Sequence, residues 1–361
     1  MATLLFTGFP GFLGKELLPR VLARRSDAGA LCVVQEKFAA QARDACAVLA
    51  RAQPHTAGRV RLVTGDITAP GLGLAAGDLP RDVVEIHHLA AIYDLGVARA
   101  PALRVNVDGT RNVLDVAERC PALERLHHVS TCYVSGRHPG LFREEDLEVG
   151  QAFNNHYEET KYLAEREVRA RMRGGLPATI YRPAITVGDA STGVTQKYDG
   201  PYFAIQWLVR QPGRLALMPV VGDLSVQVNV VPRDFVVDAI AHLAGLASSK
   251  GKTYQLADPA PLTGREMLDV LATAVGKRVV RVPLTVNTAK FALDKVPGVY
   301  RLLRIPSAFV DYMVHPTRYD TRNASADLAG SGVACPRFPT YAERMVAFVR
   351  AHPEVGAVAM A

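Results

Sequence analysis

The sequence of 361 residues predicts an α/β fold with a doubly wound parallel sheet. Short apolar segments alternate with helical segments over about the first half of the chain, which is typical of parallel sheets with helices on both faces. The first apolar segment also leads through a glycine-rich turn into a helix. Apolar residues make up 49% and charged residues 21%. This composition is ordinary for a globular protein and excludes a disordered chain, a collagen-like fibre and a simple coiled coil.

The first three predicted strands are short apolar segments bounded by turn residues. They are Thr3–Phe6, Leu31–Val34 and Val60–Val63, and Gly65-Asp66 follows the third. Between the first two, the segment from Lys15 to Arg25 has the apolar spacing of a helix. The N-terminal part therefore predicts a strand, a helix and two further strands.

The next part of the chain continues this alternation. Strands are predicted at Val83–Leu89, Leu126–Val129 and Ala178–Tyr181. Helices are predicted at Val105–Glu118, where apolar and polar positions interleave, and at Tyr157–Arg171, which is rich in charged residues. Helices between successive strands indicate parallel rather than antiparallel pairing.

The alternation loosens after Pro183. Residues 186–220 contain many Gly, Pro, Asp and Thr residues and are expected to cross a cleft, and helices are expected again from about Leu262. We predict a sheet domain of residues 1–185 plus 221–254, and a smaller mixed region of residues 186–220 plus 255–361.

The turn after the first strand has the features of a phosphate-binding loop. It reads Thr7-Gly8-Phe9-Pro10-Gly11-Phe12-Leu13-Gly14. Glycines allow the backbone to approach a phosphate closely, and a helix N-terminus offers free N–H groups and a partial positive charge. The spacing is G-x-x-G-x-x-G rather than the common G-x-G-x-x-G. A tight turn without a ligand could use the same glycines, but the strand before it and the helix after it favour a dinucleotide site.

The end of the second strand is expected to select the nucleotide. An acidic residue there binds a ribose 2′-hydroxyl, whereas a basic residue accommodates a 2′-phosphate. Gln35 is neither; Glu36 favours NAD, and Lys37, together with Arg24 or Arg25, favours NADP. The residues leave this choice open.

A tyrosine and a lysine at positions i and i+4 predict a proton donor. Tyr157 and Lys161 share one face of their helix. A tyrosine has an ordinary pKa of about 10, and a nearby positive charge is expected to lower this pKa toward neutrality. The fifth strand ends in Ser130 and Thr131, which point to opposite faces of an extended chain, so only one hydroxyl can join the site.

Other polar residues carry weaker signals. His87-His88 and His127-His128 lie near strand ends, but a metal site needs three or more converging ligands, and the nearby carboxylates show no such spacing, so no metal is expected. Asp66 could accept a hydrogen bond from an adenine amino group or cap its own loop. Tyr93 and Asp94 lie where the wall of a substrate site would be.

Taken together, these motifs resemble the extended short-chain dehydrogenase/reductase family. The likeness covers most of the first 240 residues and is most similar to the thioester reductase and fatty acyl-CoA reductase branch. The motifs are Thr7–Gly14, Gly65-Asp66-Ile67-Thr68 followed by Leu72-Gly73-Leu74, His88-Leu89-Ala90-Ala91, Asn106 with Gly109-Thr110, Val129-Ser130-Thr131, Asn155-His156-Tyr157-Glu158-Glu159-Thr160-Lys161 and Tyr181-Arg182-Pro183.

The resemblance implies roles for individual residues. Thr131, Tyr157 and Lys161 would form the catalytic triad, Asn106 would support structure and proton relay, and Pro183 would lie beside the nicotinamide. The sheet domain would be an NAD(P)-binding Rossmann domain and the smaller region would bind the substrate. The implied cofactor contacts are Gly8, Phe9, Pro10, Gly11, Phe12, Leu13, Gly14, Gln35, Lys37, Asp66, Ile67, Ala90, Ala91, Tyr157, Lys161 and Pro183.

The implied activity is hydride transfer from NADPH, with NADH as the alternative, to the carbonyl of a fatty acyl thioester. A basic residue is common at the position of Gln35 in NADPH-preferring relatives, so this residue is a departure. The alternatives are a hydroxysteroid-type or alcohol dehydrogenase or carbonyl reductase, a nucleotide-sugar epimerase, and a non-catalytic dinucleotide sensor. The last is disfavoured because Tyr157 and Lys161 are both present.

Charge and cysteine content indicate the partners. The net charge is +7, and without a basic run in the first two-thirds it does not indicate nucleic-acid binding. From Lys277 to Arg322, nine basic side chains oppose three acidic ones among apolar residues, which suits a CoA or carrier-linked substrate or an anionic membrane surface. Five scattered cysteines, no signal peptide and no long apolar segment predict a cytoplasmic protein. The family likeness also suggests a homodimer through the helices beginning near Val105 and Tyr157.

Overall fold

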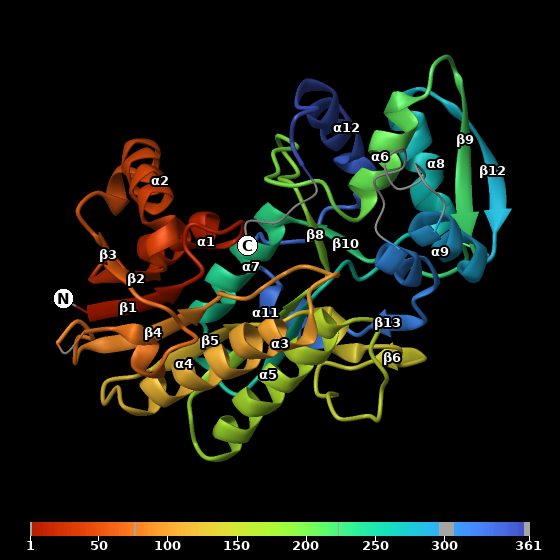
Figure 1. The fold of residues 1–361 in the computed structure, drawn as a ribbon. Helices are drawn as coiled ribbons and strands as arrows, with labels where there is room; N and C mark the ends of the chain where they lie inside the picture. Colours follow the sequence, from red (N-terminus) through yellow and green to blue (C-terminus); the bar gives the residue numbers. More distant parts are fainter. Residues whose placement is uncertain (1, 76, 223, 296–306, 357–361) are drawn as a thin grey trace.

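Seven parallel strands form the centre of the molecule in the computed structural model, which describes residues 2–75, 77–222, 224–295 and 307–356 (Figure 1). The strand order is β11-β7-β5-β4-β1-β2-β3. All six predicted strands are confirmed, and β11 is a seventh that was not predicted. The strands are β1 Ala2–Thr7, β2 Ala28–Val34, β3 Val60–Thr64, β4 Val83–His88, β5 Arg125–Val129, β7 Ala178–Pro183 and β11 Thr253–Leu256.

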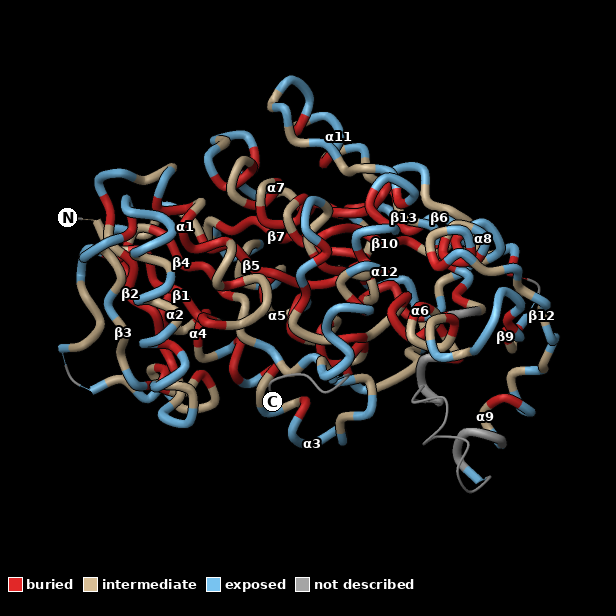
Figure 2. The backbone as a smooth tube through the Cα atoms, turned by 90° about the horizontal axis from the view of Figure 1, so that it is seen from above, coloured by how far each residue is buried: buried red, intermediate tan, exposed pale blue. Residues whose placement is uncertain are grey.

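Helices cover both faces of this sheet, as the fold class requires. On one face α1 (Gly14–Arg24), α7 (Arg233–Gly245) and α11 (Arg322–Leu328) contribute to one buried apolar cluster. On the other face α4 (Gly109–Glu118) and α5 (His156–Arg173) contribute to a second cluster. Figure 2 shows that the buried residues follow the strands between these two layers. The strand order reverses direction between β1 and β4, and such a switch point opens a crevice at the carboxyl ends of the strands.

Two helical predictions needed correction. The helix expected at Val105–Glu118 begins earlier, as α3 (Arg99–Ala102), and passes through a π-helical turn, η4 (Leu103–Asp108), before α4. Such wide turns often occur at functional sites. The second correction is α2 (Ala39–Ala52), which was not predicted because only Ala42 of its fourteen residues is buried. Its apolar face is narrow and only partly buried, since Ala45, Cys46 and Leu49 pack beside Ala42 on the core, so its helical periodicity is weak.

The rest of the chain packs around a separate apolar cluster. It combines α6 (Pro201–Arg210), α8 (Gly264–Val275) and α12 (Ala342–Ala351) with residues of β8, β9 and β10. The segment 186–220 therefore contains a helix and a strand, and Arg278–Leu284 forms a strand where helix was expected. The remaining elements are η1 Glu36–Phe38, η2 Pro54–Thr56, η3 Pro70–Gly73, η5 Cys132–Ser135, β6 Gly140–Phe142, β8 Ile185–Val187, β9 Leu215–Val221, β10 Val230–Pro232, η6 Ala247–Ser249, β12 Arg278–Leu284, α9 Val286–Lys295, η7 Ser307–Val314, β13 Thr317–Tyr319 and η8 Phe338–Thr340.

Four further sequence predictions concern membrane helices, cysteines, the basic segment and the division into domains. No described helix has both the length and the apolar composition that a membrane crossing needs. All five cysteines are free, which agrees with the expected absence of a disulfide framework. The basic segment from Lys277 to Arg322 lies partly outside the described residues, at 296–306. The division into two units stays a prediction, although α11 packs with the sheet.

Candidate active site

The glycine turn after β1 has no room for side chains at its three glycines. A Cβ added at Gly8, whose φ is +89°, would lie 2.7 Å from the amide nitrogen of Ala90. Added at Gly11 or Gly14, it would lie 2.8 or 2.3 Å from the carbonyl oxygen of Gly8. The turn thus folds back on itself and brings the start of α1 close to the end of β4. No side chain caps the N-terminus of α1. The N–H groups of Lys15 and Glu16 already donate within the turn, to Gly11 and Leu13, so what the helix start offers a pyrophosphate is the close backbone approach at the glycines and the positive end of its dipole.

Gly14→Ala is expected to weaken nucleotide binding about tenfold or more, because the methyl group must push the turn off the carbonyl of Gly8 at a cost of ~1–3 kcal/mol. Titration of NADPH by fluorescence measures the affinity. Gly96→Ala is the matched control, because its added Cβ meets only Asp94 Oδ1 at an ordinary 3.5 Å. Equal affinity of the Gly14 variant and the wild type would show that the turn does not hold the nucleotide.

The residues expected to select the nucleotide lie together, with one exception. Gln35 Nε2 donates to Asp66 Oδ2 at 2.9 Å, and the backbone N–H of Thr68 donates to Asp66 Oδ1 at 2.8 Å. Burial raises the pKa of Asp66, but the bonds from Thr68 and Gln35 outweigh it and leave the pKa below its ordinary value. Lys37 lies over the ring of Phe38, with Nζ 4.8 Å from the centroid. The ends of β2 and β3 therefore form one polar surface.

Arg24 and Arg25 are the exception. They lie at the C-terminal end of α1, away from the glycine turn, and both pair with the buried Glu85, at 2.5 and 2.9 Å. The expectation that they assist Lys37 at a 2′-phosphate is wrong. The whole length of α1 lies between the glycine turn and these two arginines, because each residue of a helix adds about 1.5 Å along its axis.

The threonine at the end of β5 faces the tyrosine of α5. Thr131 and Tyr157 are 5% and 7% exposed, and the hydroxyl of Thr131 lies close enough to the phenol of Tyr157 to influence its pKa. Thr131 donates its hydroxyl proton to the carbonyl oxygen of Pro183 at 3.4 Å. Its backbone is extended, with φ −156° and ψ 152°, so the neighbouring Ser130 points the other way and donates to Glu165 at 2.7 Å. Of the two hydroxyls left open by the sequence, that of Thr131 is therefore the one on the side of Tyr157.

Lys161 lies one turn after Tyr157 and is 4% exposed. Its ammonium group donates to the carbonyl oxygen of Val129 at 2.8 Å. Burial lowers the pKa of Lys161 to about 8, although the charge of Glu165 opposes this. The lysine is therefore fixed between α5 and β5.

The pKa of Tyr157 differs from the sequence-based expectation. Burial raises the pKa above the ordinary value, the nearby hydroxyl of Thr131 opposes the rise, and the charges of Glu158 and Asp199 add to it. A positive charge one helical turn away was expected to lower it, but burial dominates here. At neutral pH the phenol of Tyr157 therefore keeps its proton.

Asn106 connects the π-helical turn to the base of α5. Its Oδ1 accepts from the backbone N–H of Ile92 at 2.8 Å, and its Nδ2 donates to Thr160 Oγ1 at 3.0 Å. Both of its neighbours flank candidate residues: Ile92 follows Ala90-Ala91, and Thr160 precedes Lys161. Asn106 thus holds the loop after β4 against α5 and acts on the site through its neighbours.

An aromatic wall covers Tyr157 on one side. The ring of Tyr93 contacts that of Tyr157 edge-on, with centroids 5.0 Å apart. Lys197 Nζ lies 3.6 Å from the centroid of Tyr93 and pairs with Asp199 at 2.6 Å. The position of Tyr93 after β4 could be predicted, whereas Lys197 and Asp199, in an irregular segment, carried no signal in the sequence.

One polar cluster resembles a metal site. The potential ligand atoms of Glu85, His87 and His127 lie within 4.8 Å of one another, so the expectation that no carboxylate is suitably placed is wrong. However, Glu85 is already paired with Arg24 and Arg25. A divalent cation would have to share this buried carboxylate with two guanidinium groups, so the cluster is explained by its own ion pairs.

A cavity of 690 Å³ lies elsewhere on α5 and does not reach this constellation. It is lined by Arg166, Glu167 and Arg173, with Leu103 and Val107 of η4. On α5, these side chains lie on faces other than the one that carries Tyr157 and Lys161. The chemistry of the hydroxyl and ammonium groups, rather than the cavity, identifies the candidate site.

Comparisons with known proteins identify the family of this chain. A family model described as male sterility protein, an NAD-binding family, matches residues 6–240. A linear gramicidin synthase of Brevibacillus parabrevis is 30% identical over 267 residues, which are 71% of this chain and 5% of that protein. Fatty acyl-CoA reductase wat of Drosophila melanogaster is 26% identical over 273 residues, 65% of this chain and 52% of that protein. The chain thus spans about half or less of these relatives.

Solved structures extend the likeness over the whole chain. The terminal R domain from the myxalamid PKS-NRPS biosynthetic pathway has a TM-score of 0.81 at 26% identity, covering 99% of this chain and 93% of that one. The reductase domain of a nonribosomal peptide synthetase from Mycobacterium tuberculosis has a TM-score of 0.68 at 21% identity, covering 97% and 92%. The second comparison supports the fold alone.

Proposed function

Because this chain belongs to the male sterility protein family of extended short-chain dehydrogenases/reductases, we propose that it reduces the carbonyl group of a fatty acyl thioester with NADPH. It is an NAD(P)-dependent oxidoreductase, as its relatives and structural neighbours are. The substrate, the preference for NADPH and the catalytic residues are our proposal. The observation that carries it is the convergence of three buried side chains: Thr131 and Tyr157 lie close together at the carboxyl end of β5, and Lys161 lies one helical turn from Tyr157.

The residues present fit the dinucleotide at both ends. The glycine turn and the uncapped start of α1 would hold the pyrophosphate, and Gln35, Lys37 and Asp66 would line the adenosine end. When bound, the reduced nicotinamide supplies a hydride. Lys37 is the basic residue on this surface, which favours NADPH over NADH.

The chain itself orients the carbonyl and delivers a proton. The hydroxyl groups of Thr131 and Tyr157 would hydrogen-bond the carbonyl oxygen, and Tyr157 would donate its proton as negative charge develops there. Burial keeps this phenol protonated, so the donor is ready at neutral pH. The buried ammonium of Lys161 stabilises the phenolate that remains after the transfer.

The chemistry of a thioester requires one further step. A hydride on the carbonyl carbon and a proton on the oxygen give a hemithioacetal. Cleavage of its carbon–sulfur bond, with loss of the hydroxyl proton, releases a thiol and an aldehyde. A second reduction of the same type would give an alcohol.

Nicotinamide absorbance tests this function directly. NADPH and NADH are supplied in parallel with decanoyl-CoA, the same acyl group on a carrier protein, decanal and a ketone. Oxidation of NADPH with a thioester, and decanal or decanol in the extract, supports the proposal. Turnover only with decanal or the ketone contradicts the thioester assignment and indicates a carbonyl reductase.

A further inference from the structure

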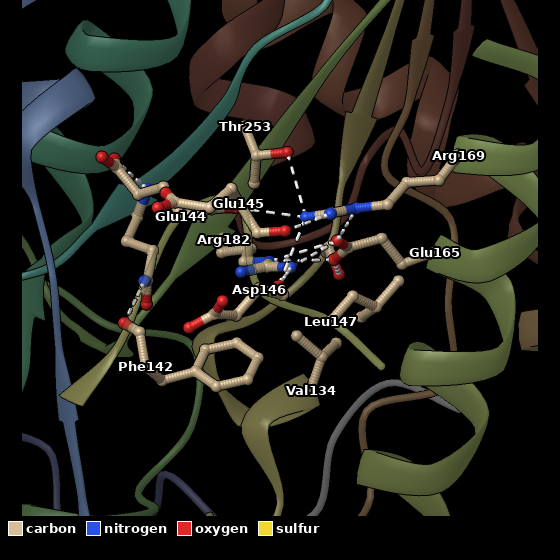
Figure 3. Close-up of polar contacts among 12 residues, drawn as sticks. Val134, Phe142, Glu144, Glu145, Asp146, Leu147, Glu165, Arg169, Arg182 and Thr253 are labelled. Carbon is tan, nitrogen blue, oxygen red and sulfur yellow. Dashed lines mark hydrogen bonds and ion pairs between the residues drawn. The ribbon is translucent and has the colours of Figure 1, made fainter. Parts of the chain in front are cut away.

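A buried ion pair lies directly beside the proposed catalytic face. Glu165 is on α5, one turn after Lys161, and Arg182 is on β7. Both side chains are 0% exposed, and Arg182 Nη2 lies 2.6 Å from Glu165 Oε1. Figure 3 shows the guanidinium and carboxylate groups meeting, with Arg169 beside them. The sequence motifs indicate no role for either charge.

Each residue of this pair is linked to Thr131 through one other residue. Glu165 Oε2 accepts from Ser130, the residue before Thr131. Arg182 precedes Pro183, whose carbonyl oxygen accepts from Thr131. The pair therefore fixes the ends of β5 and β7 against α5 at the point where the hydroxyl of Thr131 must meet Tyr157.

We propose that Glu165 and Arg182 are positioning residues for the proposed reaction: their ion pair holds Thr131 against Tyr157 and places a negative charge one turn from Lys161. The inference rests on the proposed function of Thr131 and Tyr157. It adds residues that touch neither the substrate nor the cofactor, and it assigns a task to Ser130, whose hydroxyl binds Glu165 instead of the substrate.

Stability alone is a weak reason for such a pair. Removing two charges from water costs several kcal/mol for each ion, and replacing a buried pair by apolar residues is often neutral or stabilising. Here the ion pair and Arg169 also bind the backbone of a loop that is distant in sequence. Arg182 donates to the carbonyl oxygen of Asp146 at 2.6 Å, and Arg169 donates to that of Glu145 at 2.6 Å (Figure 3). Such a network specifies one arrangement of β5, β7 and α5.

The charges around Lys161 come from three elements. His88 of β4 and His128 of β5 face the ammonium, and burial lowers the pKa of both imidazoles, so they are neutral near pH 7. Glu165 is the acidic group that acts on Lys161, and it is itself flanked by Arg169 and Arg182. Loss of its charge should therefore make the ammonium of Lys161 easier to deprotonate.

The first test compares Glu165→Gln with Glu167→Gln. Glu167 is on the same helix but pairs with Arg111 at the surface, at 2.7 Å. Isotope-labelled lysine, with Lys161 assigned through Lys161→Arg, reports its titration by NMR without any turnover. We expect Lys161 in Glu165→Gln to titrate about one pH unit or more below the wild type, and Glu167→Gln to titrate as the wild type. An unchanged titration in Glu165→Gln overturns the electrostatic part of the proposal.

The second readout separates kcat from KM with NADPH and decanoyl-CoA. Misplacement of Thr131 should lower kcat about 10- to 100-fold with little change in KM, and Glu165→Asp, which keeps the charge, should recover part of the loss. Wild-type kcat in Glu165→Gln contradicts the positioning role. If the wild type reduces neither decanoyl-CoA nor decanal, the proposed function fails on its own, and the Lys161 titration still decides this proposal.

Glu165→Gln leaves two guanidinium groups without their carboxylate and could fail to fold. The double variant Glu165→Met/Arg182→Met removes both charges at similar volume and is expected to fold. It should show the same loss of kcat, with a smaller downward shift of the Lys161 titration because the positive charge of Arg182 is removed as well. A folded double variant with wild-type kcat would reject the proposal.

Discussion

Tyr157→Phe is expected to lower kcat by about 10²- to 10⁴-fold, the usual contribution of a positioned proton donor. The phenylalanine ring keeps the edge-on contact with Tyr93, but the hydroxyl beside Thr131 is lost. In the proposed mechanism Tyr157 acts at the nicotinamide and not at the phosphates, so NADPH affinity should change little. Turnover is followed by nicotinamide absorbance with decanoyl-CoA, and affinity by fluorescence titration.

Tyr162→Phe is the matched control for this variant. Tyr162 is on the same helix, but it packs on Phe153 and Arg166, away from Thr131. Its loss of one hydroxyl should leave kcat within about twofold of the wild type. Near-normal turnover in Tyr157→Phe would remove Tyr157 from the mechanism, and a joint loss of turnover and NADPH binding would indicate a damaged fold instead.

Acidification is expected to unfold the protein between about pH 5 and 4. The four histidines of β4 and β5 are at most 2% exposed. Burial lowers the pKa of His88 and His127 to about 3, that of His128 well below its ordinary value, and that of His87 also. In the unfolded chain each would titrate near ~6.5.

The direction follows from the protons bound by each state. Below about pH 6.5 these histidines bind protons in the unfolded chain but stay neutral in the folded protein. The free energy of unfolding therefore falls with decreasing pH. Each such histidine removes ~1.4 kcal/mol per pH unit. Glu144 acts in the opposite sense, because burial raises its pKa to about 7, and it offsets roughly one histidine. The loss of unfolding free energy from the other three histidines becomes comparable to a typical stability of ~5–15 kcal/mol within a few pH units.

His128→Phe tests this account by circular dichroism across pH. Both ring nitrogens of His128 are buried without a hydrogen-bond partner, so an aromatic ring without them should move the acid midpoint to lower pH and keep the fold at pH 7.5. His352→Gln, at an exposed position outside the sheet, should leave the midpoint unchanged. An identical midpoint in His128→Phe would mean that other groups control acid unfolding.

The strands that position the site were predictable because their signals are local. Buried parallel strands are rich in apolar residues, and β1 shows an unbroken apolar run, whereas β4 and β5 combine shorter apolar segments with histidines and were placed by their position between predicted helices. The strand β11 lacks this signal: it has only four residues, including Gln255, and is buried because it pairs with β7. The helix α2 was missed because its apolar face is narrow: Ala42 is buried, and Ala45, Cys46 and Leu49 are only partly buried.

In the candidate site, too, only the features set by local sequence could be predicted. The spacing of Tyr157 and Lys161 lies within one helix and could be recognised directly. Alternation along β5 showed that Ser130 and Thr131 must diverge, but not which one faces α5. The roles of Arg24 and Glu165 depend on Glu85 and Arg182, which lie 61 and 17 residues away along the chain. Contacts across the fold of this kind leave no pattern in the sequence.

The pairing of late strands and helices with the sheet limits how this reductase can be divided or transplanted. The match to the family model ends at residue 240, but β11 forms the edge of the central sheet and α11 packs into the same core. The strand β13 also returns to pair with β6. A unit cut at residue 240 would expose the edge of β7 and uncover apolar surface beside it. A portable catalytic module built from this chain must therefore extend through Leu328.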